Sequence, residues 1–515
     1  MHSSNIVRYL KPILDRADND EKKRLTAIKE RLVGIAAPSL PAPKLGRKHF
    51  IKTSAKSKIE LPPEFNGKDY VSFLLHIDAE IEHGLLLQYL YAAYTLGGPQ
   101  IPERHRNKVR GWQEIIMGIS KEEMGHLVSV QNVLRLIGAP LNFERQDYPW
   151  DTPFYPFPFQ LERLTLNSLA KYVYAECPLE WLESDDPLAK EIKTKVESEF
   201  PHPNRVGALF TVLLELIDDP EVIADDVFQS KTYPVQAKWD EWGRGYKGGN
   251  RGNNTQANPA GAPNVLVIPL TSRDEAFNAL NDIAEQGEAT EDINDEPSHF
   301  NRFLTIYREM KAMIAEMEAE GYHGWLPSRP VATNPYINGD DVDASPVEGQ
   351  VSNEERDLIT NPEAVLWGHL LNIRYRMLLM YLSHDFLLDG GFNNSGAVSP
   401  RGTIINATFG EMYNIRSIST VMVQLPLSKE GGDKLAGPPF LLPYTLELPM
   451  DEPSRWRLHQ DLLMASASII AQLLDVTPES NHKYLYSLQE ADRKLMQIVE
   501  ELAAYPGRTF QKELL

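Results

Sequence analysis

Apolar residues recur every three or four positions over most of the chain, which is the period of helices with one face in a core. This pattern predicts helices over residues 5–35, 69–96, 107–137, 160–177, 204–217, 272–288, 298–320, 363–388, 404–424, 453–475 and 482–503. Alternation typical of strands is scarce, and "NVLVIPL" at 264–270 is its best example. The sequence therefore predicts an all-α fold.

Three interruptions of the helical pattern suggest how the chain is divided. A Pro- and Lys-rich stretch follows the first helix, a Gly- and Asn-rich stretch lies near 228–265, and a Pro-, Asp- and Asn-rich stretch covers about 325–360. We expect an N-terminal helix and linker (1–67), a helical bundle with a long surface loop (68–325), a linker (326–362) and a second, C-terminal helical domain (363–515).

Net charge and cysteine content narrow the class of protein. A formal net charge of −20, with only short basic clusters, argues against nucleic acids and anionic membranes as partners. The single cysteine, Cys177, leaves no internal disulfide and fits a reducing compartment. The N-terminus lacks the apolar core of a signal peptide, and no apolar run approaches the length of a membrane span. These features predict a cytoplasmic location.

Four of the predicted helices carry a glutamate inside the apolar stripe, where an acidic side chain is not expected. These residues are Glu82, Glu123, Glu176 and Glu288. His126 lies on the same face as Glu123, among Ile, Leu and Val residues, whereas the neighbouring Glu122 is predicted to face solvent.

Buried glutamates on four helices of one bundle indicate a metal site. An ionised carboxylate in a core costs several kcal/mol unless it is paired or binds a metal, and two divalent cations would neutralise four carboxylates. Glu123 and His126 can offer an oxygen and a nitrogen from adjacent turns. Bundles that hold two iron ions use a second such pair, but Glu291 stands where that histidine is needed. His299, directly after the predicted helix N-cap Ser298, is the candidate sixth ligand.

Spacing alone does not identify the site, and several residues have a structural interpretation beside the functional one. The 72 acidic residues and 13 histidines predict about two acid-x-x-His pairs by chance, and the chain has at least four. Asp78 is either a hydrogen-bond partner of a ligand histidine or an exposed acid. Tyr89 lies on the ligand face; such tyrosines are more often core, but it is the candidate catalytic residue. A structural role is preferred for Glu80 with His83, Glu320 with His323, Cys177, His369 and His384.

Four stretches of the sequence, taken together, resemble a known protein family. "AEIEHGLLLQYLYAAYTL", "SKEEMGHLVSVQNVLRLIGAPL", "YVYAECP" and "IAEQGEATEDINDEPSHFNRF" resemble the ferritin-like domain of the iminophenyl-pyruvate dimer synthase family, whose members couple two oxidised amino-acid imines in bisindole pigment pathways such as those of violacein and rebeccamycin. The resemblance covers about residues 68–310 and implies a ferritin-like four-helix bundle. It also implies metal ligands at Glu82, Glu123, His126, Glu176, Glu288 and His299.

The function that we expect is that of a non-haem di-iron oxidoreductase of secondary metabolism, which uses O2 and an amino-acid-derived small molecule as substrates. Glu123 and Glu288 are the expected bridging ligands, and His126 and His299 the terminal ones. A single ion or another divalent metal is the alternative cofactor. The alternative functions are an imine-dimerising synthase and a non-catalytic ferritin-like metal-binding or scaffold protein. The oligomeric state stays open, with a homo-oligomer as one option.

Overall fold

The computed structural model describes the chain from residue 59 onward with gaps, together with a few earlier residues. The described residues are 9, 13–16, 19–23, 25, 59–149, 157–200, 203–242, 264–289, 297–337, 356–389, 393–394, 397–442, 446–506 and 510–511. Those before residue 59 are helical, and the remainder of the helix predicted over 5–35 lies outside the described residues.

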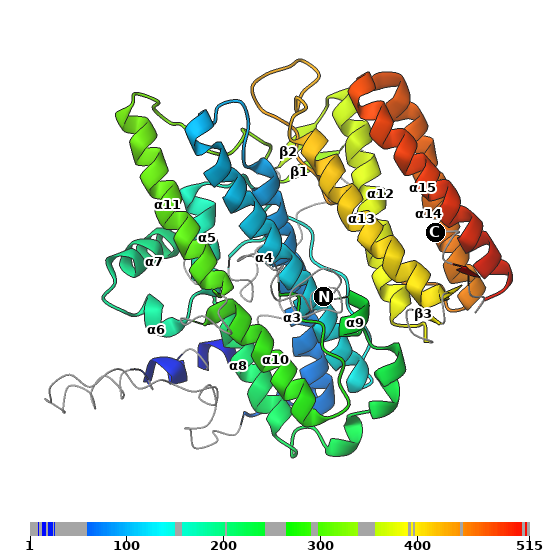
Figure 1. The fold of residues 1–515 in the computed structure, drawn as a ribbon. Coiled ribbons are helices and arrows are strands. Elements are labelled where there is room, and N and C mark those ends of the chain that lie inside the picture. Colours follow the sequence, from blue (N-terminus) through cyan, green and yellow to red (C-terminus); the bar gives the residue numbers. More distant parts are fainter. Residues whose placement is uncertain are drawn as a thin grey trace, which may run out of the picture.

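A four-rod bundle forms the first part of the structure. Two rods are the long helices α3 (Gly67–Thr95) and α4 (Glu103–Leu136), which pack along each other. Each of the other two rods consists of two shorter helices: α5 (Leu166–Glu176) with α8 (Val206–Asp218), and α10 (Arg273–Glu288) with α11 (His299–Ala319). α11 packs on α5 and α10 packs on α8, so both composite rods are interrupted at a similar height (Figure 1).

Local sequence signals set the ends of these helices. The Asn66 side chain accepts a hydrogen bond from the Asp69 N–H and caps α3, and Ser298 caps α11 in the same way through Asn301, as predicted. Thr165 and Ser168 form a capping box at the start of α5. That helix therefore begins later than the predicted residue 160, and it ends at Glu176, two residues before Pro178.

Short helices surround the bundle where the sequence predicted none. They are α6 (Leu179–Leu182), α7 (Pro187–Glu199), α9 (Trp239–Trp242) and two 3-10 helices, Asp225–Val227 and Ser230–Val235. In the described part of the surface loop predicted near 228–265, residues 230–235 and 239–242 are helical, and Gln236 and Trp242 are buried. Residues 243–263 of that loop lie outside the described residues.

The predicted strand at 264–270 is an extended segment that joins no sheet. It lies against α4, and side chains of that helix form hydrogen bonds with its main-chain N–H and C=O groups. Ser129 Oγ donates to the Leu266 carbonyl at 2.9 Å and accepts from the Ile268 N–H at 3.1 Å, while Asn132 donates to the Ile268 carbonyl at 2.9 Å. β-Branched and apolar residues therefore gave a strand signal for a segment whose partner is a helix.

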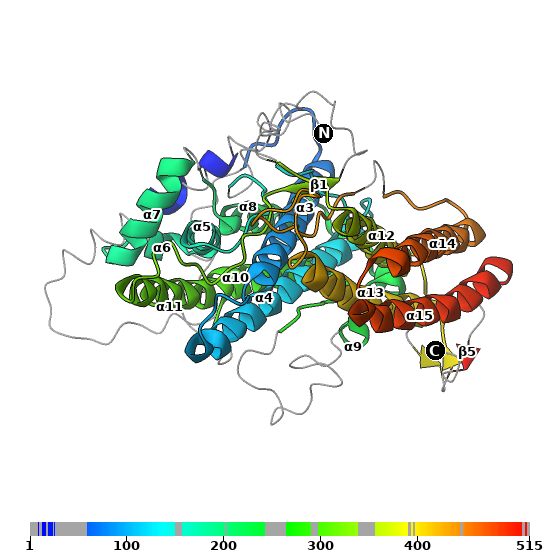
Figure 2. The same cartoon turned by 90° about the horizontal axis from the view of Figure 1, so that it is seen from above.

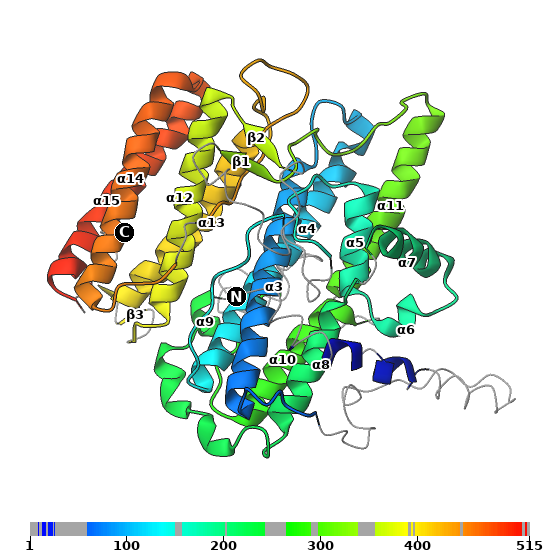
Figure 3. The same cartoon turned by 180° about the vertical axis from the view of Figure 1, so that it is seen from behind.

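The C-terminal part is a second helical layer beside α3 and α4 (Figures 1 and 3). It contains α12 (Pro362–Asp385), α13 (Pro400–Met422), α14 (Glu452–Val476) and α15 (Glu479–Ala504). α12 packs on α13 and on α14, α14 packs on α15, and α13 reaches α3. The view from above separates the layers clearly (Figure 2). The all-α prediction is confirmed.

The described residues contain few strands, but one strand pair joins two segments of the linker predicted over 326–362. β1 (Pro335–Ile337) pairs in parallel with β2 (Asp357–Ile359), with Tyr336 opposite Leu358. β3 (Asn393–Asn394), β4 (Ala397–Val398) and β5 (Phe510–Gln511) form a small antiparallel sheet in the order β3-β4-β5. Because the Ala332 N–H donates to the Leu435 carbonyl at 2.8 Å, the described part of 326–362 is attached to the C-terminal layer.

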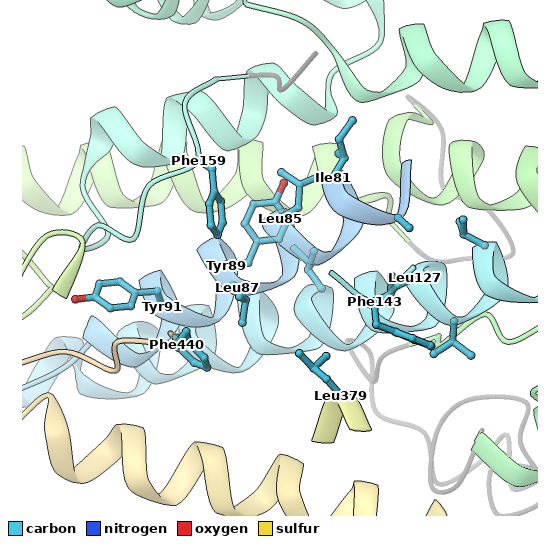
Figure 4. Packing of buried hydrophobic residues seen from close by; sticks show 14 of the residues in the cluster. Ile81, Leu85, Leu87, Tyr89, Tyr91, Leu127, Phe143, Phe159, Leu379 and Phe440 are labelled. Carbon is cyan, nitrogen blue, oxygen red and sulfur yellow. The ribbon is translucent and has the colours of Figure 1, made fainter. Parts of the chain in front are cut away.

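One apolar core continues across the two helical layers. Figure 4 shows Leu85 and Tyr89 of α3 on one side of this core, and Leu379 of α12 and Phe440 on another. None of the described helices is both long enough and apolar enough to cross a membrane.

Candidate metal centre

Five of the six predicted ligands meet in the middle of the bundle, at the height where two rods are interrupted. Glu82 comes from α3, Glu123 and His126 from α4, Glu176 is the last residue of α5 and His299 the first residue of α11. All are buried. They form two triads, Glu82/Glu123/His126 and Glu123/Glu176/His299, and the donor atoms within each triad lie within 4.8 Å of one another.

Glu123 is shared by both triads and lies between the two histidines. Its Oε2 is 2.9 Å from His126 Nδ1, and its Oε1 is 2.9 Å from His299 Nδ1. On the outer sides, Glu82 Oε2 lies 3.3 Å from His126 Nδ1, and Glu176 Oε2 lies 3.9 Å from His299 Nδ1. The predicted bridging role of Glu123 fits this geometry.

Unsatisfied atoms indicate that a cation fits here. Glu82 Oε2, Glu123 Oε1 and His299 Nδ1 are buried, and although each lies 2.9 or 3.3 Å from another atom of the triads, none forms a hydrogen bond of suitable geometry with a described residue. Such atoms are rare in a core, since an unpaired buried polar group costs about 1–3 kcal/mol. A set of carboxylate oxygens and imidazole nitrogens suits divalent first-row metals, including iron. The residues present therefore fit a pair of metal ions.

The sixth predicted ligand, Glu288, stands aside from both triads. Its carboxylate accepts a hydrogen bond from the Gly207 N–H at the start of α8, at 2.7 Å, and lies 3.7 Å from Arg205. The partial positive charge of a helix N-terminus favours this position. A Cβ at residue 207 would lie 2.2 Å from each Glu288 oxygen, so any residue other than glycine there would displace this carboxylate. Glu288 still lines the cavity that the other five ligands line.

Comparison with known proteins agrees with this architecture. The sequence model of the Ferritin-like family matches residues 75–308. This segment is a ferritin-like domain. The predicted family resemblance is thereby confirmed at the level of the fold.

Two curated relatives add distant homology over a longer stretch. The chain is 26% identical to dichlorochromopyrrolate synthase of Lentzea aerocolonigenes over an alignment of 405 residues. This alignment covers 73% of this chain and 36% of the synthase. The chain is 22% identical to 2-imino-3-(indol-3-yl)propanoate dimerase of Chromobacterium violaceum over an alignment of 442 residues. This alignment covers 78% of this chain and 37% of the dimerase. The chain thus spans little more than a third of these relatives. In a structural comparison, the crystal structure of a ferritin-like protein from Caulobacter vibrioides aligns with this chain at 14% sequence identity and a TM-score of 0.36. The alignment covers 68% of this chain and 95% of the Caulobacter chain.

In the ferritin-like domain, the candidate catalytic residue Tyr89 contacts a predicted ligand, Glu176, and does not line the cavity. Its hydroxyl donates to Glu176 Oε1 at 2.6 Å. Its ring packs against Tyr172 and Phe303, with ring centroids 4.8 Å away in each case. Tyr89 is not among the described residues that line the cavity, whose apolar wall includes Leu85, Phe210 and Ile283. The tyrosine therefore orients Glu176, leaving Oε2 turned toward His299.

Burial and mutual contact strongly shift the pKa values of the predicted ligands. Burial raises the pKa of Glu82 well above its usual value and that of Glu176 to about 7. For the two histidines burial acts to lower the pKa, but neighbouring carboxylates outweigh it and raise the pKa of both. Burial acts to raise the pKa of Glu123, and the histidines on either side lower it overall. Without metal, the site therefore favours the protonated forms of Glu82, Glu176 and both histidines, and bound cations would displace these protons.

Glu122 contradicts the sequence prediction. It was expected to face solvent, but it is only 2% exposed. Its Oε1 accepts from the Asn264 N–H at 2.7 Å, and its Oε2 accepts from Arg302 and lies 3.1 Å from His299 Nε2. The reason for the error is that α4 has no solvent face here, since residues 116–134 are buried with the exception of Lys121.

Gln286 was also missed, because its polarity placed it outside the apolar stripe of its helix. Its Oε1 lies 2.8 Å from His126 Nε2, and its Nε2 donates to the Asn264 carbonyl at 2.9 Å. Each predicted histidine ligand thus has a partner on the ring nitrogen that faces away from the triads.

The remaining alternatives are largely decided by burial. Asp78 is 0% exposed and neither of its oxygens has a hydrogen-bond partner among the described residues, so it is neither an exposed acid nor bonded to a histidine. His83 is hydrogen-bonded through Nε2 to the Tyr375 hydroxyl of α12, at 2.5 Å. His384 lies between His459 and Glu452, at 2.9 Å from each. Glu80 accepts hydrogen bonds from Asn142 and Gln146, the Cys177 thiol donates to the Tyr174 carbonyl, and Glu320 accepts from Arg104.

Proposed function

We propose that the ferritin-like domain holds two divalent metal ions, with iron as the first candidate, and uses O2 to oxidise an amino-acid-derived small molecule of secondary metabolism. The observation that carries this proposal is the position of Glu123, with one oxygen toward each of two buried histidines. The homology to two biosynthetic enzymes, one of which is named for an imino acid derived from an indole amino acid, supports the class of substrate.

The protein groups have separate roles in this proposal. Bound ferrous ions would supply the electrons that reduce O2. Glu123, His126 and His299 would hold these ions, Glu123 through an oxygen on either side and the histidines through Nδ1. Tyr89 fixes Glu176 through its hydroxyl. Leu85, Phe210 and Ile283 form an apolar wall that excludes water from the reacting centre.

Elemental analysis is the direct test of the metal site. We expect about two metal ions per chain in the purified protein, because two triads share one bridging carboxylate. The Glu123→Ala/His126→Ala variant removes the bridge and one terminal ligand and should lose both ions. The matched control is Glu114→Ala/His105→Ala on the same helix, α4, at positions with greater exposure.

The number of metal ions bound by the wild type, the control and the ligand variant decides between the possible functions. Two ions in the control and none in the ligand variant support the proposal. One ion in the wild type overturns the two-metal form, and metal content that is unchanged in the ligand variant overturns the site itself. Two ions without O2 consumption during turnover assays would leave a metal-binding protein and overturn the oxidoreductase function.

Coupling of two imines is the second candidate function, and the two named relatives favour it. The test supplies the protein with the imine that an L-amino-acid oxidase forms from tryptophan, and mass spectrometry measures the products. A coupled dimer that appears with the wild type and the Glu114→Ala/His105→Ala control, but not with Glu123→Ala/His126→Ala, is the expected result. Oxidised monomer alone would favour the first candidate.

A further inference from the structure

The segment Asn264–Leu270, called the strap below, crosses α4 directly beside the predicted ligands. Val265, Val267 and Leu270 are buried in this segment. Ser129 and Asn132 hold its middle, and Gln236 holds its end through hydrogen bonds of 2.6 and 2.9 Å with the Leu270 main chain. The strap is therefore fixed along its length by side chains and does not depend on a sheet.

Gly125 lets the strap lie this close to the metal centre. A Cβ at residue 125 would be 2.8 Å from Val265 Cγ1 and 2.9 Å from the Leu266 carbonyl oxygen. Since carbon and oxygen atoms do not approach so closely without a shift, any larger residue would push the strap away from α4. Gly125 stands between the ligands Glu123 and His126, so this close approach occurs at the level of the site.

The main chain of Asn264, the first described residue of the strap, contacts both residues that lie behind the histidines. Its N–H donates to Glu122 Oε1 at 2.7 Å, and its carbonyl accepts from Gln286 Nε2 at 2.9 Å. Glu122 in turn faces His299 Nε2 at 3.1 Å, and Gln286 faces His126 Nε2 at 2.8 Å. One residue thus connects, through two side chains, to both imidazoles.

These contacts decide which nitrogen of each ring is available. The Gln286 amide group donates to Asn264, so its oxygen must accept the His126 Nε2–H. Glu122 accepts from Asn264 and Arg302 and therefore also accepts from His299 Nε2–H. In both rings Nδ1 is left facing the triads, which is the orientation that a metal ligand needs.

We propose that the strap, with Gly125 beneath it, is a positioning element that fixes the orientation of both predicted histidine ligands through Glu122 and Gln286. This inference rests on the proposed metal site. It adds that residues outside the triads determine how tightly each ion is held. The two ions depend on different side chains, Glu122 and Gln286, but on a common strap.

Three variants separate the parts of this arrangement. Glu122→Gln places an amide NH2 against a donor whichever way it is turned, and so disturbs His299. Gln286→Met removes the acceptor of His126 while keeping the side-chain length. Gly125→Ala displaces the strap and should disturb both histidines. Gly111→Ala is the matched control, since it makes the same change on the same helix and a Cβ there meets nothing within 4 Å.

Titration with Co(II), followed by visible absorption, gives the affinity for each ion. We expect Glu122→Gln and Gln286→Met each to weaken one of two Co(II) ions, by about 10- to 100-fold, and Gly125→Ala to weaken both. The Glu122→Gln/Gln286→Met double variant should behave as Gly125→Ala does. Unchanged affinity in Gly125→Ala, with the wild type binding two ions, would overturn the strap proposal and leave the metal site intact.

A second measurement keeps the two proposals distinguishable. Imidazole 15N signals of His126 and His299 in the metal-free protein report the protonation and hydrogen bonding of each ring nitrogen. They should shift in Gly125→Ala and stay as in the wild type in Gly111→Ala. Failure of the wild type to bind Co(II) overturns the proposed function, and unshifted signals in Gly125→Ala overturn the strap. If Gly125→Ala does not fold, the two side-chain variants still decide the question, because they leave the strap's contact with Gly125 unchanged.

Discussion

The metal-free protein is expected to lose stability as the pH rises from about 6.5 to 8, and the metal-loaded protein is expected to gain it. The metal-free slope arises from groups that hold protons only in the folded state. Burial raises the pKa of Asp78 and of Glu288 to about 8 and that of Glu176 to about 7. In the unfolded chain these carboxyls have already lost their protons at pH 6.5, so every rise in pH favours unfolding.

The buried histidines of the triads act in the same direction. Despite burial, neighbouring carboxylates raise the pKa of His126 and of His299 above the usual value. Stability that these rings contribute as protonated groups is lost as the pH rises through their folded pKa. Each proton held only by the folded state changes the free energy of unfolding by about 1.4 kcal/mol per pH unit, so several such groups amount to a large effect.

Other histidines set the lower limit of this pH window. Burial lowers the pKa of His83 to about 3 and that of His459 well below its usual value. Because these rings take up a proton only on unfolding, they reduce stability as the pH falls below about 6.5. Above that pH the unfolded rings are also neutral, and the carboxyls and the triad histidines determine the slope.

Metal reverses the slope because a ligand must be deprotonated before it can bind. The measurement is the free energy of urea unfolding at pH 6.5 and 8, with a chelator and with excess Co(II). Asp78→Asn, which cannot ionise, should flatten the metal-free slope, whereas Asp282→Asn, at an exposed position of α10, should leave it as in the wild type. A slope of the same sign with and without metal would contradict the coupling of these protons to a metal site.

The apolar stripes of the sequence predicted the helices and the buried glutamates correctly, because both depend on a local period. Glu82, Glu123, Glu176 and Glu288 are all buried. The position of His299 could also be predicted, since Ser298 is a local capping signal for α11. An apolar stripe predicts which side of one helix faces the core. For a helix whose opposite side faces solvent, this is sufficient to predict which residues are buried.

The same reasoning fails where a helix is covered on every side. Around Glu122, α4 is enclosed by the strap and by neighbouring helices, so the position opposite the apolar stripe is buried too. The sequence could not place the strap on α4, because the contacts between them join residues more than 130 positions apart, as Ser129 and Leu266 are. Nor could it show that the Glu288 carboxylate is turned to the start of α8, which depends on the space left by Gly207.

In the C-terminal layer, the sequence predicted helices but not the polar group at their centre. Arg374 of α12 donates to Glu411 of α13 at 3.0 Å, to Asp492 of α15 at 2.8 Å and to Ser466 of α14 at 2.6 Å. All four side chains are buried. Each helix of the layer thus contributes one member of this cluster, which fixes how the four helices meet.

Arg374→Met is expected to destabilise the protein by about 3–5 kcal/mol, because it leaves Glu411 and Asp492 in the core without a positive partner. Burial already raises the pKa of Glu411, even though Arg374 opposes it, so removing the arginine would drive this carboxyl further toward its neutral form. Urea unfolding of the variant and the wild type measures the loss. Arg376→Met is the control, since Arg376 is half-buried two residues away and forms no ion pair with a described residue.

A triple variant distinguishes the loss of charge balance from the loss of packing. In Arg374→Met/Glu411→Leu/Asp492→Leu no buried charge remains, and apolar side chains of similar volume occupy the cluster. Replacing a whole buried ionic group in this way is often neutral or stabilising, so we expect most of the lost stability to return. If the triple variant is no more stable than Arg374→Met, then the cluster acts by specifying the geometry of the four helices, and its charge balance is not what the single substitution disturbs.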